Sequence, residues 1–207
     1  LPDCRQASQP CVLHPQEDPL IFMRLFVAIE LPEDIRGELV AVEEKLENFF
    51  KARWVAKDNI HLTLKFLGDV EEKMLEDIKK TVSEISQKNH GFDLTLKDIG
   101  GFPDLKRPRV LWIGVEQGKK NTMRLMEQLE KELTKFGIKP EKREKSPHIT
   151  IGRVKGLAQR DTEKRQEDIH KLTYKSRVFR ADAVSLIQSV LTPSGAVYTV
   201  LGRYALQ

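Results

Sequence analysis

Two short segments of the sequence repeat one pattern of histidine, threonine and aliphatic residues. They read HLTL at residues 61–64 and HITI at residues 148–151. Successive side chains of a β-strand point to opposite faces, so His61 and Thr63 would share one face and the leucines the other. His148 and Thr150 would share a face in the same way. The pattern predicts two strands that each keep aliphatic side chains for the core and present a histidine and a threonine to a cleft.

Two histidines that face one cleft are suited to acid–base chemistry. The imidazole pKa is about 6.5, so near neutral pH one ring can be neutral and accept a proton while the other is charged and donates one. Such a pair fits an in-line displacement at phosphorus, in which one ring activates the incoming oxygen and the other protonates the leaving oxygen. The hydroxyl groups of Thr63 and Thr150, with basic groups nearby, would hold the non-bridging oxygens.

The two segments are also compatible with less specific interpretations. A single His-x-Thr segment on a strand usually contains only a partly exposed histidine, whereas two at equivalent positions of a duplicated chain favour a shared function. Neither segment has the His-x-x-x-His or cysteine spacing of a metal site, and no carboxylate shares a strand face with either histidine. The glycines in GDV and GGFPD fit neither dinucleotide-binding nor Walker patterns. We therefore expect neither a metal ion nor a cofactor.

The elements before each histidine segment are repeated as well. The strand RLFVAIE at 24–30 precedes a helical stretch at 31–50, and RVLWIGVE at 109–116 precedes a second one at 121–137. Apolar residues recur at helical spacing in both stretches. These buried stripes are Ile35, Leu39, Val42, Leu46 and Phe49 in the first stretch and Met126, Leu129, Leu133 and Phe136 in the second. Gly137 is expected to cap the second helix.

The spacing of the two halves supports a duplication. Glu30 and His61 are 31 residues apart, and Glu116 and His148 are 32 apart. A helical stretch follows each histidine strand, at 75–85 and, more weakly, at 158–172, and further strands follow at 92–100, 177–191 and 196–206. This order predicts an α+β fold with two pseudo-symmetric lobes, each a small antiparallel sheet with helices on its outer face, and a cleft between them. We expect a single domain over 23–207, with halves at approximately 23–105 and 106–207.

Composition is that of a globular protein. The 207 residues are 40% hydrophobic and 32% charged, and no apolar run approaches the roughly 20 residues of a membrane-spanning helix. No stretch resembles a secretory signal, so we expect a cytoplasmic protein without membrane partners. The formal net charge is only +4, but residues 135–155 carry seven basic and two acidic residues around His148. This segment is either a solvated loop or an electrostatic collar for phosphate.

Residues 1–22 differ from the rest of the chain. Both cysteines, Cys4 and Cys11, and four of the ten prolines fall in this segment, which has no apolar periodicity. We interpret it as a flexible leader or a remnant of cloning. Because the remaining chain has no cysteine, a disulfide framework, a cysteine nucleophile and a cysteine-ligated metal are not expected.

The paired HLTL and HITI segments resemble those of the two-histidine phosphoesterase superfamily, in particular the RNA 2′,3′-cyclic phosphodiesterases, also called 2′-5′ RNA ligases. The resemblance extends over residues 23–207 and includes MRLFVAIELP and FPDLKRPRVLWIGV. It implies hydrolysis of a 2′,3′-cyclic phosphate at an RNA end to a 2′-phosphomonoester, without metal or nucleotide cofactor. It also implies the reverse reaction, joining such an end, for example on tRNA halves, to a 5′-hydroxyl.

The resemblance implies roles for individual residues too. His61 would donate a proton and His148 would accept one, and the residues five positions further on, Phe66 and Arg153, would stack on the terminal base and contact phosphate. A regular strand would turn Phe66 and Arg153 away from the histidines. A bulge at Gly152 would bring Arg153 back, whereas Phe66 is equally well read as a core residue.

Strand alternation adds one candidate, and two other functions stay open. Lys65 would share the face of His61 and contact phosphate.

We expect a monomer that acts on RNA ends. The alternatives are a protein that binds RNA ends without turnover, and a phosphodiesterase for small cyclic nucleotides such as ADP-ribose 1″,2″-cyclic phosphate.

Overall fold

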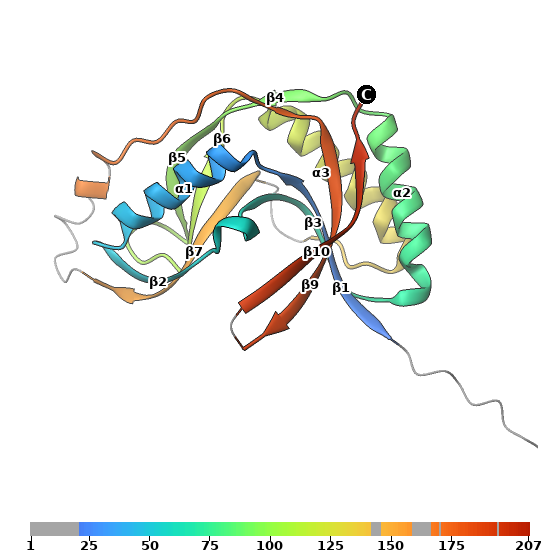
Figure 1. Ribbon diagram of the computed structural model, residues 1–207, viewed down its shortest axis with the longest axis horizontal. Helices are drawn as coiled ribbons and strands as arrows, with labels where there is room; N and C mark the ends of the chain where they lie inside the picture. The colour runs from blue at the N-terminus through green and yellow to red at the C-terminus, as the bar shows by residue number, and fades with distance from the viewer. Residues whose placement is uncertain (1–20, 142–145, 159–166, 170, 194) are drawn as a thin grey trace, which may run out of the picture.

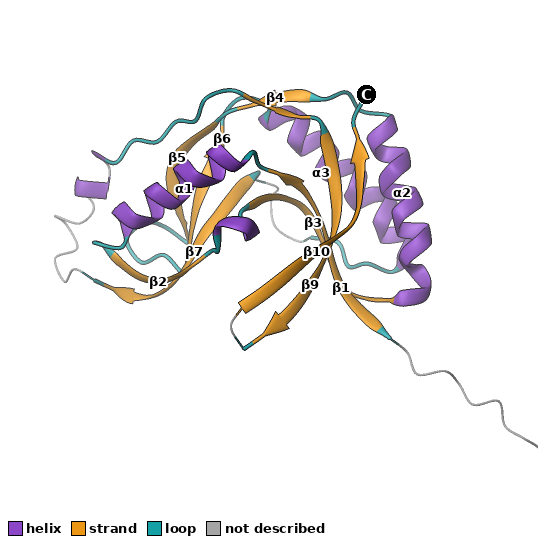
Figure 2. Ribbon diagram, viewed as in Figure 1, coloured by secondary structure: helices purple, strands orange, loops and turns teal. Residues whose placement is uncertain are grey.

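The computed structural model describes residues 21–141, 146–158, 167–169, 171–193 and 195–207. It contains ten strands and three longer helices in these ranges (Figures 1 and 2). The strands are β1 (Phe22–Glu30), β2 (Phe50–Trp54), β3 (His61–Glu71), β4 (Phe92–Leu94), β5 (Leu96–Phe102), β6 (Val110–Val115), β7 (His148–Leu157), β8 (Phe179–Ala181), β9 (Ala183–Thr192) and β10 (Gly195–Ala205). The helices are α1 (Glu33–Leu46), α2 (Leu75–Gln87) and α3 (Lys119–Leu133), and short 3₁₀ turns cover Lys57–Asn59, Glu72–Met74 and Thr134–Phe136.

Two antiparallel sheets of four strands form two lobes. The first lobe has the strand order β10-β9-β1-β3, with α2 against β9 and β10 and α3 against β3. The second lobe has the order β2-β7-β6-β5, with α1 against β7. Strands β4 and β8 form a separate pair. The predicted α+β fold with two lobes of antiparallel strands is confirmed (Figure 2).

Each lobe contains segments from both halves of the sequence. Strands β1 and β3 of the first half pair in one sheet with β9, from near the end of the chain, while β2 and β5 join β6 and β7 of the second half. The helices are exchanged as well, because α1 follows β1 but packs on β7, and α3 follows β6 but packs on β3. The lobes therefore do not coincide with the halves 23–105 and 106–207. The boundary between these halves of the duplicated sequence stays a prediction.

The predicted helices form where apolar periodicity and end signals agree. Pro32 precedes α1, and Glu33 and Asp34 lie in its first turn, where carboxylates interact favourably with the helix dipole. Gly137 ends the turn after α3 with a φ of 75°, the left-handed conformation that glycine adopts most easily. The expected stripes are buried at Ile35, Leu39, Val42, Leu46 and Phe49 and at Met126, Leu129 and Leu133, whereas Phe136 is only partly buried. Of the stretch expected at 158–172, residues 167–169 are helical, and most of the rest lies outside the described residues.

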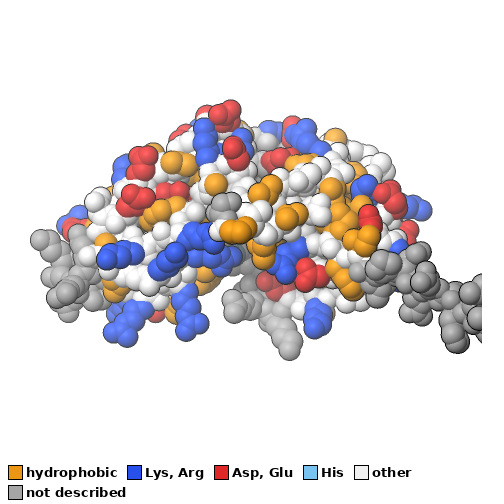
Figure 3. Space-filling view, turned by 60° about the horizontal axis from the view of Figure 1, so that its bottom comes forward, with side chains coloured by type: hydrophobic (Ala, Val, Ile, Leu, Met, Phe, Trp, Pro, Cys, Tyr) orange, Lys and Arg blue, Asp and Glu red, His pale blue; other side chains and the backbone are white. Residues whose placement is uncertain are grey.

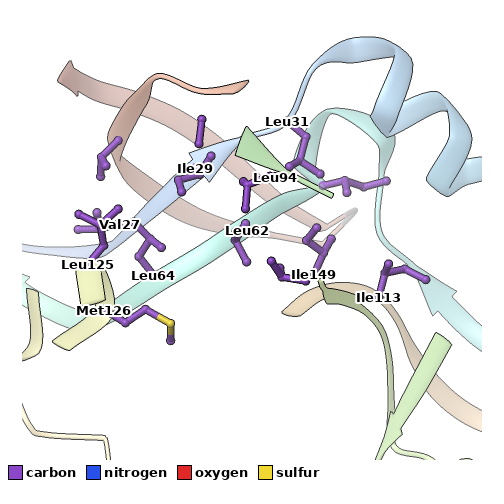
Figure 4. Packing of buried hydrophobic residues seen from close by; sticks show 14 of the residues in the cluster. Val27, Ile29, Leu31, Leu62, Leu64, Leu94, Ile113, Leu125, Met126 and Ile149 are labelled. Atoms are coloured by element: carbon purple, nitrogen blue, oxygen red, sulfur yellow. The ribbon is translucent and has the colours of Figure 1, made fainter. Parts of the chain in front are cut away.

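One large apolar core continues through both lobes. Leu62 and Leu64 of β3, Ile113 of β6 and Ile149 of β7 all belong to it (Figure 4). Burying an aliphatic side chain of this size contributes about 1.5–3 kcal/mol, so the core ties the two sheets together along β3 and β7. A second, small cluster of Phe26, Ala28 and Ile187 lies apart from this core, with Tyr198 packed against it.

The start of the chain was expected to be distinct. The first strand begins at Phe22, one residue before the expected start, and residues 1–20, including both cysteines, lie outside the described residues. Within the ranges that the structure describes, no helix is long and apolar enough to cross a membrane.

Candidate active site

The two histidine motifs occupy equivalent positions at the junction of the lobes. His61 is the first residue of β3 and His148 is the first residue of β7. The two strands lie in different sheets but adjoin each other, and Leu62 and Ile149, which follow the histidines, meet in the common core (Figure 4). This packing brings both motifs to the same junction.

Both imidazoles are anchored by the same backbone contact. Nδ1 of His61 lies 2.7 Å from the carbonyl oxygen of Asn59, and Nδ1 of His148 lies 2.7 Å from that of Ser146. Because a carbonyl only accepts, each Nδ1 carries a proton and donates it, which leaves Nε2 for chemistry. Nε2 of His61 lies 2.9 Å from Oγ1 of Thr63, so the predicted histidine–threonine pair is in contact in the first lobe.

A β-bulge follows the threonine in both motifs. In the first lobe, Thr63 pairs with Ala28 and Lys65 with Val27, so Leu64 is the additional residue. In the second lobe, Thr150 pairs with Trp112 and Gly152 with Leu111, so the additional residue is Ile151. A bulge of this kind shifts every later side chain by one position relative to a regular strand.

The bulges place Phe66 and Arg153 on the histidine face. Phe66 is 60% exposed, and its ring lies 6.0 Å from that of Phe26, which stacks on His61. Arg153 is exposed and close enough to Tyr198 of the other lobe for its charge to affect the phenol. Strict alternation was therefore wrong for Phe66, as was its reading as a core residue, whereas Arg153 follows a bulge beside Gly152 as the alternative reading proposed. Their roles toward a substrate stay a prediction.

The same bulge turns Lys65 away from His61. Lys65 is only 3% exposed, and its Nζ donates to Oε1 of Glu130 at 3.1 Å and to the carbonyl oxygen of Lys139 at 3.0 Å. The prediction that Lys65 shares the face of His61 and contacts phosphate was wrong, because it assumed a regular strand. Lys65 instead fixes α3 and the chain that leads toward β7.

Aromatic side chains surround both histidines, and the sequence analysis did not identify them. The ring of Phe26 stacks on His61 at 4.8 Å, and Tyr198 meets it edge-on at 5.5 Å. Phe102 meets His148 edge-on at 5.0 Å, and Trp112 lies 6.1 Å away. Phe26 and Trp112 come from β1 and β6, the strands paired with the histidine strands, so cross-strand register was the signal that could have found them.

Burial affects the acid–base properties of the first histidine. Desolvation lowers the pKa of His61, and the contact with the Asn59 carbonyl and the charge of Glu30 partly oppose this. Glu30 is paired with His61 across β1 and β3, and its carboxylate accepts a 2.6 Å hydrogen bond from Oγ of Ser185. His61 is therefore mostly neutral near neutral pH in the free protein. Burial also raises the pKa of Tyr198, while the charge of Arg153 opposes this, so the phenol stays protonated.

Two hollows adjoin the histidine face. A cavity of about 130 Å³ is lined by Glu30, Asn59, His61 and Tyr198, among others. A larger groove of about 560 Å³ begins at Phe66 and continues along the end of β3 to Asp69, Glu71 and Lys139. In the described part of the chain, no three His, Cys, Asp or Glu side chains lie close enough to hold a metal ion.

Comparison with known proteins assigns this chain to a family. A profile of the family described as LigT like Phosphoesterase matches it twice, at residues 29–112 and 113–198, with one histidine motif in each match. An RNA 2′,3′-cyclic phosphodiesterase of Aquifex aeolicus is 35% identical over 89% of this chain and 97% of its own length. One of Methanocaldococcus jannaschii is 37% identical over 88% of this chain and its full length.

Solved structures agree with the sequence relatives. The crystal structure of TT0787 of Thermus thermophilus has a TM-score of 0.74 and 30% identity, and it covers 89% of this chain and 98% of that protein. Escherichia coli LigT complexed with 3′-AMP has a TM-score of 0.72 and 29% identity, covering 90% of this chain and 99% of LigT. The repeated match, the paired histidine strands and these relatives together show that the chain belongs to the LigT-like phosphoesterase family.

Proposed function

We propose that this protein hydrolyses RNA 2′,3′-cyclic phosphate ends to 2′-phosphomonoesters without a metal ion. The observation that carries the proposal is the pair of histidines on adjoining strands, each held through Nδ1 by a carbonyl two residues earlier and each leaving Nε2 for proton transfer. The relatives named RNA 2′,3′-cyclic phosphodiesterase support the choice of substrate.

The reaction needs one proton acceptor and one proton donor. In the proposal, Nε2 of His148 accepts a proton from water as the water oxygen attacks phosphorus and the bond from phosphorus to O3′ breaks. Nε2 of His61, in its charged form, donates a proton to O3′. The overall reaction consumes one water and leaves a 2′-phosphate and a 3′-hydroxyl. The anionic phosphate raises the pKa of His61 when it binds and so supplies the charged donor.

The other polar groups would hold the phosphate. The hydroxyls of Thr63 and Thr150 and the guanidinium of Arg153 lie on the histidine face and would bind the non-bridging oxygens, where negative charge develops. Phe66, exposed beside Phe26, would stack on the terminal base. In the ligation, a 5′-hydroxyl would take the place of water, attack phosphorus as the bond to O3′ breaks, and give a 2′-5′ linkage; tRNA halves are substrates of suitable chemistry. The protein would act in the cytoplasm as a monomer.

The test uses an oligoribonucleotide that ends in a 2′,3′-cyclic phosphate. With EDTA present, the parent protein should open the ring and leave the phosphate on the 2′ oxygen, as end-group analysis will show. His61→Ala and His148→Ala should each lower kcat by about 10²–10⁴, the range for loss of a general acid or base. His90→Ala, an exposed histidine outside the site, is the matched control and should retain parental activity.

Three outcomes would contradict the proposal. Full activity in the doubly substituted protein would exclude the two-histidine mechanism. RNA binding without any turnover by the parent, unchanged in both alanine variants, would favour an end-binding protein. Dependence of the parent on an added divalent ion would exclude the metal-independent reaction.

A further inference from the structure

The strands β2 and β7 present four cationic side chains beyond the second histidine motif. Arg53 of β2 is paired directly with Arg153 of β7, and Lys51 is paired with Gly156 at a register shift that leaves Lys155 as the additional residue. All four side chains are exposed. Phe50, which precedes Lys51, and Val154, which lies between Arg153 and Lys155, contact the core. The cations therefore occupy one face of the β2–β7 ladder, in line with His148 and Thr150.

Within the described part of the chain, three of these cations have no acidic partner. Lys51, Arg153 and Lys155 form no ion pair with any residue in the described ranges. Like charges directly opposite each other across two strands destabilise a sheet, so an anion bound between Arg53 and Arg153 would relieve their repulsion. The Arg53 guanidinium lies 3.1 Å from the place where a Cβ on Gly195 would be, so it reaches the β9–β10 hairpin of the other lobe.

The rest of the histidine face has a different character. On the first lobe, the surroundings of His61 are aromatic and aliphatic, and the groove beyond Phe66 is lined by the carboxylates of Asp69 and Glu71 with one lysine, Lys139. Figure 3 shows the same division, with Lys and Arg side chains gathered on the side that carries β2 and β7 in Figure 1 and more hydrophobic side chains on the other. Asp69 is paired with Arg24 and Glu71 with Lys73, so a polyanion leaving the site would be attracted more strongly along β7 than along β3.

We propose that Lys51, Arg53 and Lys155, which lie beyond Arg153 at the cyclic phosphate, bind the phosphates that precede the cyclic end of an RNA strand, so that the protein selects oligonucleotides over mononucleotide 2′,3′-cyclic phosphates. Side chains two residues apart on a strand are separated by about 6.6 Å, which suits a row of phosphates on an extended chain. The proposal rests on the proposed function and names its substrate class.

The experiment compares two substrates with one set of variants. One substrate is an RNA roughly eight nucleotides long with a 2′,3′-cyclic phosphate end, within the length that single-strand binding sites commonly cover. The other is the mononucleotide adenosine 2′,3′-cyclic phosphate. The double variant Lys51→Gln/Lys155→Gln leaves both arginines in place. It should lower the ratio of kcat/KM for the RNA to kcat/KM for the mononucleotide by about three- to tenfold, and should reduce the slope of log(kcat/KM) against log[salt] by roughly 1.4.

A charge-matched control separates this effect from a general loss of positive charge. Lys119 and Lys120, at the start of α3, are exposed, and Lys119→Gln/Lys120→Gln should leave the substrate ratio and the salt slope as in the parent. The inference is overturned if the parent uses the mononucleotide as efficiently as the RNA, or if the two double variants behave alike. Failure of the parent to hydrolyse either substrate would instead contradict the proposed function.

Discussion

The two halves of the chain carry a glutamate at equivalent positions, and the two lobes stabilise this glutamate in different ways. Glu130 on α3 and Glu43 on α1 are 87 residues apart, as are His61 and His148, and each helix packs on the histidine strand of its lobe. In the first lobe Lys65 forms a buried ion pair with Glu130. The position equivalent to Lys65 in the second lobe is Gly152, again 87 residues later, so a glycine stands there in place of the lysine.

Among its described residues, the second lobe has no equivalent ion pair. Trp54 fills the space of the missing lysine, and Glu43 is protonated. A Cβ on Gly152 would lie 2.7 Å from the Trp54 ring, so the indole occupies the space of the missing side chain. Glu43 is 5% exposed, and burial, followed by the charge of Glu47, raises its pKa to about 8. Near neutral pH Glu43 is mostly protonated and avoids the cost of a buried charge. The comparison shows that the bulge and the histidine are common to both lobes, whereas the ion pair between Lys65 and Glu130 is specific to the first lobe.

The largest effect is expected where the ion pair is broken. Lys65→Ala removes the buried ammonium that contacts both Glu130 and the carbonyl of Lys139, and should lower the free energy of unfolding by about 3–5 kcal/mol. Urea unfolding measures the change. The double variant Lys65→Met/Glu130→Leu should recover most of it, because well-packed apolar residues can replace a buried pair. A loss below about 1 kcal/mol in Lys65→Ala, the size of a surface pair, would show that the pair is solvated.

A smaller effect is expected from a methyl group at the equivalent position in the second lobe. Gly152→Ala forces Trp54 to move and should lower the free energy of unfolding by about 1–3 kcal/mol. Gly156→Ala, on the same strand with nothing within 4 Å of the new Cβ, is the control and should change stability little. Equal effects of the two substitutions would contradict the close packing of Trp54 on β7.

The buried acid of the second lobe predicts a pH-dependent stability. Its folded pKa of about 8 lies above the value of about 4.3 in the unfolded chain, so the folded state holds the proton more tightly. The free energy of unfolding should therefore fall as pH rises from about 4.3 to 8. Glu43→Gln removes this loss, so the stability of the variant relative to the parent should increase as pH rises from about 4.3 to 8.

A neighbour on the same helix provides the control for that measurement. Glu44 is exposed on α1, and Glu44→Gln should leave the pH dependence of unfolding as in the parent. If Glu43→Gln and the parent lose stability in parallel between about pH 4.3 and 8, the carboxyl of Glu43 is not the buried acid described above.

The smallest effect is expected on the pKa of His61. The charge of Glu30 raises the pKa of His61, so Glu30→Gln should lower this pKa further. If His61 is the proton donor, activity falls as pH rises through its pKa, and the alkaline limb of kcat/KM should move to lower pH. Movement of the acidic limb instead would assign His61 as the acceptor. Glu72→Gln, an exposed carboxylate on the 3₁₀ turn after β3, should move neither limb.

Most of the strands and helices could be predicted from the sequence. The stripes at helical spacing in α1 and α3 identified residues that are buried, because amphipathic helices owe their position to burial of one face. The two histidine motifs were found by alternation over three residues, a span too short for an irregularity to intervene. Beyond Thr63 the same reasoning failed for Phe66 and Lys65, because a bulge inserts a residue without a partner on the neighbouring strand and so changes the face of the side chains that follow.

The sequence by itself determined the duplicated order of elements and the two strands on which histidine and threonine share a face, because helical and strand periodicity are local properties. The tertiary structure alone decided which residues join them. It exchanged α1 and α3 between the lobes, brought Tyr198 to His61 and Phe102 to His148, and turned Lys65 inward toward Glu130. These contacts join residues 45 or more positions apart, and they form only when burial of the common core fixes the register of neighbouring strands.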